Sequence, residues 1–233
     1  MPGRLADTLW PDVPYGALVL VPLGSTEQHG PHLPLSTDTV IARAVAERAA
    51  GLLPGTALVA PALPYGASGE HAGFPGTVSL GHEALRAVLV ETVRSLALWA
   101  GRTAFVNGHG GNHETLKAAV GALRREGHDV GWTGCDVPGG DAHAGVTETS
   151  LLLHLAPERV LMPRAAPGER RPLPAIMPRL RTGGVRSVSP TGVLGDPTGA
   201  NADQGRRMLR ELASDVAGRI TAWRVDGLGR LMR

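Results

Sequence analysis

Short runs of apolar residues alternate along the chain with longer segments of helical periodicity, and this alternation restricts the fold more than any other feature. Residues 17–23 form a continuous apolar run that Gly24 ends, as expected of a strand buried in a parallel sheet. The clearest helical period, in residues 82–101, repeats apolar residues every three or four positions. Strands are predicted at 17–23, 57–60, 103–107 and 129–133, and helices at 38–53, 82–101, 111–127, 148–155 and 202–223. This order predicts a layered α/β/α fold with a mostly parallel central sheet.

Length and composition favour a single α/β domain that spans residues 1–233. The 233 residues fall within the usual size of one domain. Aromatic residues make up only 3% of the chain, so the core has to be built from Ala, Val and Leu. Residues 163–197 are rich in Pro, Gly and Arg and have little periodicity. Because they end in a tight turn at 192–197, we interpret them as an ordered excursion and not as a linker.

The charge pattern and the cysteine count exclude several kinds of partner. The 23 basic and 21 acidic side chains give a net charge of +2 and are scattered, so a nucleic-acid partner is not expected. The longest apolar run, residues 17–23, is too short to span a bilayer, and residues 1–10 show no signal-peptide pattern. Cys135 is the only cysteine, so an internal disulfide is impossible. We therefore expect a cytoplasmic protein that does not bind a membrane.

The first of three groups of acidic and histidine residues follows the strand at 17–23. It consists of Glu27, His29 and Asp38, on a loop constrained by Gly and Pro. Glu27 and His29 are two residues apart, so in an extended loop their side chains point to the same side. All three are types that bind metal ions. The structural alternative is that Thr37 or Asp38 caps the next helix.

The other two groups follow the strands at 103–107 and 129–133. His109 lies in a Gly-rich turn directly after the first of these strands, which places it at a strand end. His143 and Glu148 follow the second, with Glu148 in the first turn of the next helix. A purely structural interpretation is that a neighbouring threonine caps this helix and that Glu148 only interacts with its dipole.

Because ligands of open α/β sheets bind at the carboxyl ends of the strands, we expect the three groups to form one site. Their carboxylates and imidazoles suit two adjacent divalent ions that Asp38 bridges. Such a pair of ions holds a hydroxide between them and polarises a carbonyl oxygen. Ligands without cysteine fit Zn²⁺, Mn²⁺ or Fe²⁺. The chain has no dinucleotide-binding glycine motif, no P-loop and no Gly-x-Ser-x-Gly elbow, so those three functions are excluded.

Four sequence motifs resemble the signature of the creatininase family. They are Gly-Ser-Thr-Glu-Gln-His-Gly-Pro-His-Leu-Pro at 24–34 with Thr-Asp at 37–38, Asn-Gly-His-Gly-Gly-Asn at 107–112, His-Ala-Gly at 143–145 with Glu-Thr-Ser at 148–150, and Gly-Asp-Pro at 195–197. The resemblance implies a metal-dependent amidohydrolase with a layered α/β fold that assembles as a homo-oligomer. By position, it implies that Glu27 and His109 hold one ion, that His29 holds the other, and that Asp38 bridges them.

One position departs from the family pattern. Creatininase has a ligand glutamate two residues after its equivalent of His109, whereas this chain has Gly111. We expect Glu148 to supply the missing ligand, or alternatively to act as a base on the bridging water. His143 is assigned the role of proton donor to the leaving amine, since an amide anion is a very poor leaving group.

Of the remaining histidines, two lie near the predicted site. His71, in a Gly-rich loop, could border the pocket, and His32 could touch substrate or be structural. The others, His82, His113, His128 and His154, are expected on helix surfaces or in the core.

Within the family, residues 65–71 and 189–197 most resemble a subgroup of peptidases that act on a ribosomally made precursor peptide. The resemblance implies release of a modified C-terminal dipeptide, derived from Val-Tyr, during the biosynthesis of a redox cofactor. The first alternative is hydrolysis of a small cyclic amide or formamide. The second is a non-catalytic metal-binding scaffold subunit, against which the full set of candidate ligands argues.

Overall fold

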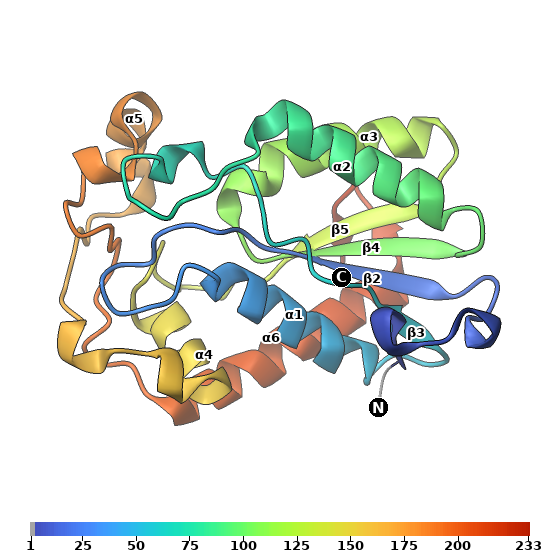
Figure 1. Ribbon diagram of the computed structural model, residues 1–233, viewed down its shortest axis with the longest axis horizontal. Helices are drawn as coiled ribbons and strands as arrows, with labels where there is room; N and C mark the ends of the chain where they lie inside the picture. Colours follow the sequence, from blue (N-terminus) through green and yellow to red (C-terminus); the bar gives the residue numbers. More distant parts are fainter. Residues whose placement is uncertain (1–2) are drawn as a thin grey trace.

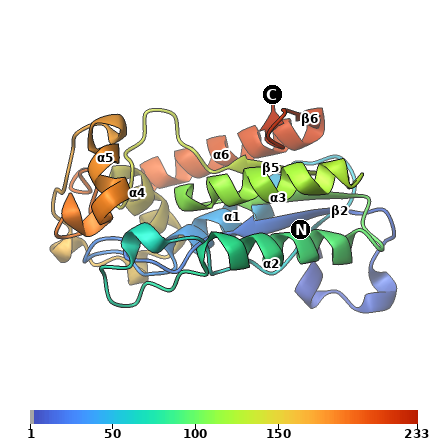
Figure 2. The same ribbon diagram turned by 90° about the horizontal axis from the view of Figure 1, so that it is seen from above.

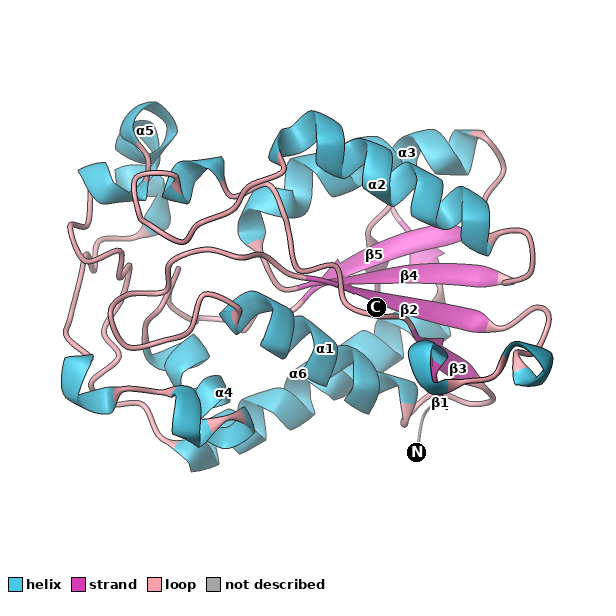
Figure 3. Cartoon of the chain, viewed as in Figure 1, coloured by secondary structure: helices cyan, strands magenta, loops and turns pink. Residues whose placement is uncertain are grey.

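The computed structural model describes residues 3–233, in which five parallel strands form the central sheet (Figure 3). The strand order is β1-β3-β2-β4-β5. The strands are β1 (Gly3–Arg4), β2 (Leu18–Leu23), β3 (Ala57–Val59), β4 (Arg102–Asn107) and β5 (Val130–Gly134). All four expected strands are present, and the two-residue β1 is an addition too short to leave a pattern in the sequence. The all-parallel pairing confirms the predicted sheet.

Helices cover both faces of the sheet (Figures 1 and 2). Helices α2 (Gly81–Leu96) and α3 (His113–Arg125) lie on one face. Helices α1 (Thr37–Ala50) and α6 (Ala202–Ala222) lie on the other, and α4 (Val146–Leu155) packs against α6. A parallel sheet between two layers of helices confirms the predicted layered α/β/α class.

The core divides into two clusters because successive residues of each buried strand point to opposite faces. In β2, Val19 and Val21 pack in the cluster under α2 and α3, whereas Leu20 packs in the cluster under α1 and α6. Small side chains dominate the second cluster: Ala46 and Ala49 of α1 are fully buried. The large aromatic side chains fully buried in residues 3–233 are Phe105 and Trp132. Closely packed aliphatic side chains therefore fill most of the core.

The Pro-rich excursion contains a helix that the sequence pattern did not predict, α5 (Leu173–Gly183), with Pro178 inside it. This helix stands beyond the end of the sheet, at the left of Figure 1. It has a small core of its own, built from Ile176, Val185 and Leu194. The helix therefore forms a separate wall at one end of the molecule.

Short elements complete the chain. Strands β6 (Arg224–Val225) and β7 (Leu231–Met232) form an antiparallel pair next to β5. The 3-10 turns are η1 (Leu5–Asp7), η2 (Trp10–Asp12), η3 (Gly69–His71), η4 (Gly110–Asn112), η5 (Pro157–Arg159), η6 (Met162–Arg164) and η7 (Val185–Ser187). In the described part of the chain, none of the helices combines the length and apolar character that crossing a bilayer requires.

Candidate functional site

The three groups of site residues come together at the carboxyl ends of β2, β4 and β5, as the topology requires. Their side chains are almost completely buried, apart from Glu148, which is about one-fifth exposed. The structure brings together all six residues singled out in the sequence: Glu27, His29, Asp38, His109, His143 and Glu148.

Asp38 lies between two histidines that come from different strands. Its Oδ1 is 2.9 Å from Nε2 of His29, and its Oδ2 is 3.2 Å from Nδ1 of His109. Ser25 Oγ also donates to Oδ2, at 2.8 Å. Helix α1 begins at Thr37 with no side-chain cap, so the structural alternative, a cap from Thr37 or Asp38, does not apply. The carboxylate of Asp38 is thus free to face two ligand positions at once.

The first candidate donor group consists of Glu27, Asp38 and His109, whose ligand atoms lie within 4.8 Å of one another. Glu27 Oε2 is 3.2 Å from Nε2 of His109. Asn112 holds the loop that carries His109. Its Nδ2 donates to the backbone carbonyl of Gly24 and to Oδ1 of Asn107, each at 3.0 Å. These bonds tie the end of β4 to the end of β2 and fix the two donors relative to each other.

A second donor group contains His29, His143 and Glu148. Glu148 Oε2 is 3.8 Å from Nε2 of His29 and accepts the backbone N–H of Ala144 at 2.6 Å. Ala144 has a φ of 53°, in the left-handed region that non-glycine residues rarely adopt. Through this turn, the Glu148 carboxylate in the first turn of α4 lies beside His29.

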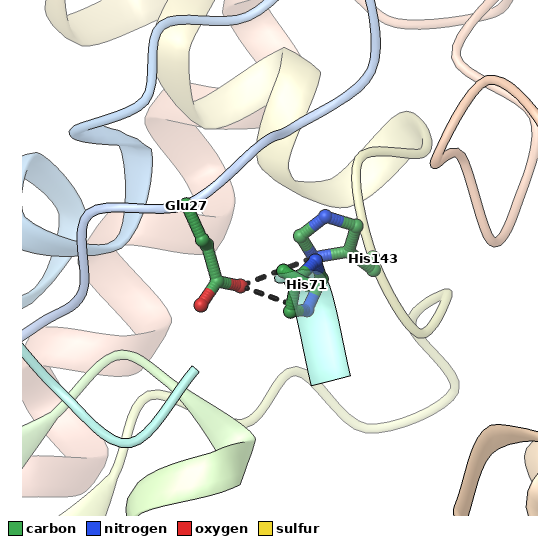
Figure 4. A group of neighbouring side chains, drawn as sticks. All are labelled: Glu27, His71 and His143. Atoms are coloured by element: carbon green, nitrogen blue, oxygen red, sulfur yellow. Dashed lines mark ion pairs between the residues drawn. The ribbon is translucent and has the colours of Figure 1, made fainter. Parts of the chain in front are cut away.

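A third group, Glu27, His71 and His143, is drawn in Figure 4. Glu27 Oε1 is 3.2 Å from Nε2 of His71 and 3.8 Å from Nδ1 of His143. His71 comes from η3, and the sequence suggested only that it could border the pocket. The turn at 192–197 holds His143 in place, because the backbone groups of Leu194 and His143 exchange two hydrogen bonds.

Glu70 is a site residue that the sequence reasoning missed. Its Oε1 lies 3.4 Å from Nε2 of His109. A Cβ added at Gly111 would lie 2.6 Å from this oxygen and would collide with the ring of His109. Gly111, where creatininase has a ligand glutamate, is therefore next to the Glu70 carboxylate, which comes from another loop. In the sequence, Glu70 was marked only by its place beside His71.

Buried carboxylates and imidazoles control each other's protonation. Burial opposes the charge on Glu27, but His109 outweighs it and lowers the Glu27 pKa to about 2. Burial likewise opposes the charge on His29, yet Asp38 and Glu148 raise its pKa to about 10. Burial raises the pKa of Glu148 to about 7. Without metal ions, protons on the imidazoles balance the charge of the carboxylates.

His143 behaves differently from His29. Burial, together with His29 and His71, holds the pKa of His143 well below its ordinary value, so the ring is neutral. Its ring centroid lies 4.3 Å from that of His29 and 4.6 Å from that of His71. A neutral ring in this position has a lone pair to offer.

The residues present fit divalent metal ions. Both carboxylate oxygens of Glu27 are buried and have no hydrogen-bond partner among residues 3–233, which is costly for a charged group that no ion compensates. His29 Nδ1 is 3.1 Å from the carbonyl of Glu27, and His109 Nε2 is 3.2 Å from the carbonyl of Ala67. Metal-ligating histidines are usually oriented by a carbonyl in this way.

A cavity of about 1120 Å³ opens from the donor groups toward α5. Leu173 and Met177 of α5 line one side of it, and His113 and Lys117 of α3 line another. The unpredicted helix α5 is therefore a wall of the site. A cavity of this size exceeds the pockets that hold most small ligands.

The other histidines lie outside the donor groups. His32 Nε2 is 2.9 Å from Thr149 Oγ1, and burial lowers the His32 pKa to about 4. His82 and His113 reach the cavity lining, although they were expected only on helix surfaces or in the core. His128 and His154 do not line the cavity.

Comparison with known proteins gives one consistent family. A sequence profile described as creatininase, creatinine amidohydrolase, matches residues 6–220. The mycofactocin precursor peptide peptidase of Mycobacterium ulcerans is 57% identical over 222 residues, which cover 92% of this chain and 86% of the relative. Creatinine amidohydrolase of Pseudomonas putida is 31% identical over 183 residues, which cover 63% of this chain and 67% of that enzyme.

Solved structures agree with the sequence matches. A putative creatinine amidohydrolase from Bacteroides fragilis superposes with a TM-score of 0.81 at 26% identity, covering 95% of this chain and 96% of that one. A manganese form of creatininase and a mutant creatininase of Zn–Zn type have TM-scores of 0.76 and 0.75. Both are 26% identical and cover 95% of this chain and 98% of theirs.

Proposed function

Since the chain belongs to the creatininase family, we propose that it is a metal-dependent peptidase that acts on the mycofactocin precursor peptide. The bond cleaved would release a modified C-terminal dipeptide derived from Val-Tyr. The observation that carries this proposal is the 57% identity to the mycofactocin precursor peptide peptidase over nearly the whole chain. The match to creatinine amidohydrolase is weaker and shorter, so a small cyclic amide is the less favoured substrate.

The cavity supports a substrate larger than a single small ring. Its volume of about 1120 Å³ lies above the range of about 300–1,000 Å³ that is typical of small-molecule pockets. Leu173, Met177 and Leu180 of α5 give it an apolar wall next to the donor groups. An extended peptide segment that carries an apolar or aromatic side chain fits this combination of length and chemistry.

For the metal centre, we assign one divalent ion to Glu27 and His109 and a second to His29 and Glu148, with Asp38 shared. The two Asp38 oxygens face different histidines, which supports a carboxylate shared by both ions. Four carboxylates surround the centre, Glu27, Asp38, Glu70 and Glu148, so two doubly charged cations would balance their charge. Such ions, as Zn²⁺, Fe²⁺ or Mn²⁺, supply polarisation of the scissile carbonyl and increase the acidity of water.

The chain's own residues then handle the proton. His143 is neutral, so it has to accept a proton from the attacking water before it can donate one to the leaving nitrogen. Its Nδ1 points toward Glu27, on the side of the donor groups. Glu148, whose pKa of about 7 lies near the working pH, is the alternative base if it does not bind an ion.

The remaining assignments follow the family and the composition. We assign residues 1–233 to one domain and expect the chain to form a homo-oligomer in the cytoplasm. Exposed side chains of the N-terminal segment, Leu9, Trp10 and Tyr15, offer apolar surface for contact between subunits. Light scattering coupled to size-exclusion chromatography measures the number of subunits, and a monomer at working concentration would contradict the oligomer.

Mass spectrometry of the metal-loaded protein incubated with the modified precursor peptide tests the function. We expect a peptide shortened by its C-terminal dipeptide, together with the released fragment. A parallel reaction with creatinine tests the small-amide alternative. Turnover of creatinine with an intact peptide would favour that alternative, and no turnover of either by a fully loaded protein would favour the scaffold.

A further inference from the structure

The excursion at 163–197, which contains α5, has more arginines than its own acidic residues can pair. It holds six arginines and two acidic residues, Glu169 and Asp196, although the whole chain has a net charge of only +2. Arg171 pairs with Glu169 at 2.6 Å, and Arg170 pairs with Asp196 at 3.3 Å. The other four are exposed and have no ion-pair partner among residues 3–233: Arg164, Arg179, Arg181 and Arg186.

Two of these four arginines, Arg181 and Arg186, line the cavity that opens from the donor groups. Arg181 lies in the last turn of α5. It continues the stripe of the helix that faces the cavity, since Leu173, Met177 and Leu180 precede it on the same side at spacings of three and four residues. The wall formed by α5 is therefore apolar along most of its length and positively charged at its end.

Contacts with the loop after η3 hold Arg186 at the edge of the cavity. Its Nη1 donates to the carbonyl of Gly73 at 2.7 Å, and its guanidinium carbon lies 5.7 Å from the centre of the Phe74 ring. Because η3 carries His71, this loop leads directly from the donor groups. A guanidinium has five N–H groups, so the bond to Gly73 leaves four for a ligand.

The acidic side chains that line the cavity outside the metal centre have other partners. Glu114 pairs with Lys117 at 2.7 Å, and Asp136 pairs with Arg230 at 2.7 Å. Asp141 accepts a backbone N–H of α4 at 3.1 Å. The two arginines of the cavity wall are thus available to a carboxylate that a ligand brings.

The length of the wall indicates which part of a peptide would meet these arginines. From Leu173 to Arg181 the helix rises about 12 Å, at about 1.5 Å per residue. Two extended residues span only about 7 Å. The proposed reaction releases a C-terminal dipeptide, so all other residues of the peptide lie on the N-terminal side of the scissile bond. Only this N-terminal part is long enough to extend along α5.

We propose that Arg181 and Arg186 bind an acidic stretch of the substrate peptide on the N-terminal side of the scissile bond, an assignment that rests on the proposed function. A guanidinium binds a carboxylate through two parallel hydrogen bonds, a geometry that lysine does not offer. Exposed pairs of this kind strengthen binding modestly, by about 2–5-fold for each arginine. The two arginines act on substrate affinity and specificity and leave the chemical step unchanged.

Fluorescence anisotropy of the metal-loaded, full-length protein tests this surface without any turnover. The probe is a labelled peptide of alternating glutamate and serine with an amidated C-terminus, and the comparison probe has glutamine in place of glutamate. We expect tighter binding of the glutamate peptide. The double variant Arg181→Gln, Arg186→Gln should weaken that binding by about 10-fold and remove the preference. Added salt should weaken binding in the same way, because it screens exposed charges.

The matched control is Arg207→Gln. Arg207 is an exposed arginine of α6 that does not line the cavity, so this variant should bind both probes as the unmodified protein does. Equal binding of the two peptides by the unmodified protein, or an unchanged preference in the double variant, overturns the proposal.

Kinetics with the modified precursor peptide place the surface in the reaction. The double variant should raise KM about 10-fold and keep kcat, as expected when an interaction is equally strong in the ground state and the transition state. Replacing acidic residues before the scissile bond by their amides should raise KM for the unmodified protein but not for the double variant. A lower kcat, or a KM that still rises in the double variant, overturns the proposal. A peptide that no variant cleaves contradicts the proposed function instead, and the anisotropy result stands apart from it.

Two further results would assign the arginines to another partner and overturn the proposal. One is a single-stranded oligonucleotide of equal negative charge that binds more tightly than the glutamate peptide, which would indicate a nucleic-acid surface. The other is a changed number of subunits in the double variant, measured by light scattering, which would place the arginines in a contact between copies of the chain.

Discussion

Zinc binding should release about two protons per chain from the site histidines at pH 8 to 9, in addition to a proton from water bound to the ions. In the ion-free protein, burial opposes a charge on His29, but Asp38 and Glu148 raise its pKa to about 10. His109 is also buried, and Glu27 and Asp38 raise its pKa well above the ordinary value. Both rings are therefore protonated in this range, and both have to lose a proton before they can bind an ion.

The magnitude follows from the number of protons. Each released proton changes the free energy of binding by about 1.4 kcal/mol per pH unit, so the two histidine protons change it by about 2.7 kcal/mol, or roughly 100-fold in affinity. The sign is fixed: affinity rises with pH up to the His29 pKa of about 10 and falls on acidification. Below pH 7 the slope should steepen, because Glu148, whose pKa burial raises to about 7, then also has to lose a proton.

Isothermal titration calorimetry in two buffers of equal pH and different ionisation enthalpy counts the protons. His29→Asn should release one proton fewer than the unmodified protein. His113→Ala, a cavity histidine outside the donor groups, should release the same number. Zinc binding without proton release, or an unchanged count in His29→Asn, refutes this account of how the site is charged.

Three substitutions test individual roles. Asp38→Ala should weaken both ions because its two oxygens face His29 and His109, and elemental analysis that finds one ion fully retained would remove it from the bridge. His143→Ala should keep the metals and reduce kcat roughly 10²–10⁴-fold; loss of metal would instead make it a ligand. Glu148→Gln should lose one ion selectively, and metal titration should restore turnover. Full occupancy without activity would identify Glu148 as the base.

The sheet and its helices were predictable because each buried strand left a clear signal. The run at 17–23 is apolar at almost every position, as a strand covered on both faces must be, and it became β2 (Leu18–Leu23). Once four strands were predicted to lie parallel, the carboxyl ends had to meet. This geometric rule is why Glu27, His109 and Glu148, far apart in sequence, could be assigned to one site.

Helix α5 could not be predicted for the opposite reason. Pro178 and the surrounding glycines break the helical pattern, and only one of its residues, Ile176, is fully buried. Its position depends on contacts with residues from other segments, such as Val185 and Leu194, which no local pattern encodes. The shape of the cavity therefore had to come from the structure.

The contacts of Glu70, His71 and Gln28 could not be predicted from any local pattern either. Glu70 matters because Gly111 leaves room for its carboxylate beside His109, a relation between two separate loops. Gln28 stands between two candidate ligands in the sequence, where nothing marks it as different. Only the structure shows that its amide nitrogen lies between His71 and His143.

Hydrolysis of the modified precursor peptide in H₂¹⁸O tests the central claim most directly. A metal-dependent peptidase transfers one oxygen from water to the new C-terminal carboxyl group of the shortened peptide. We predict incorporation of one ¹⁸O atom into that fragment with the metal-loaded protein, and no cleavage after the metal is removed. An uncleaved peptide with the loaded protein, or a shortened peptide without ¹⁸O, would contradict the assignment.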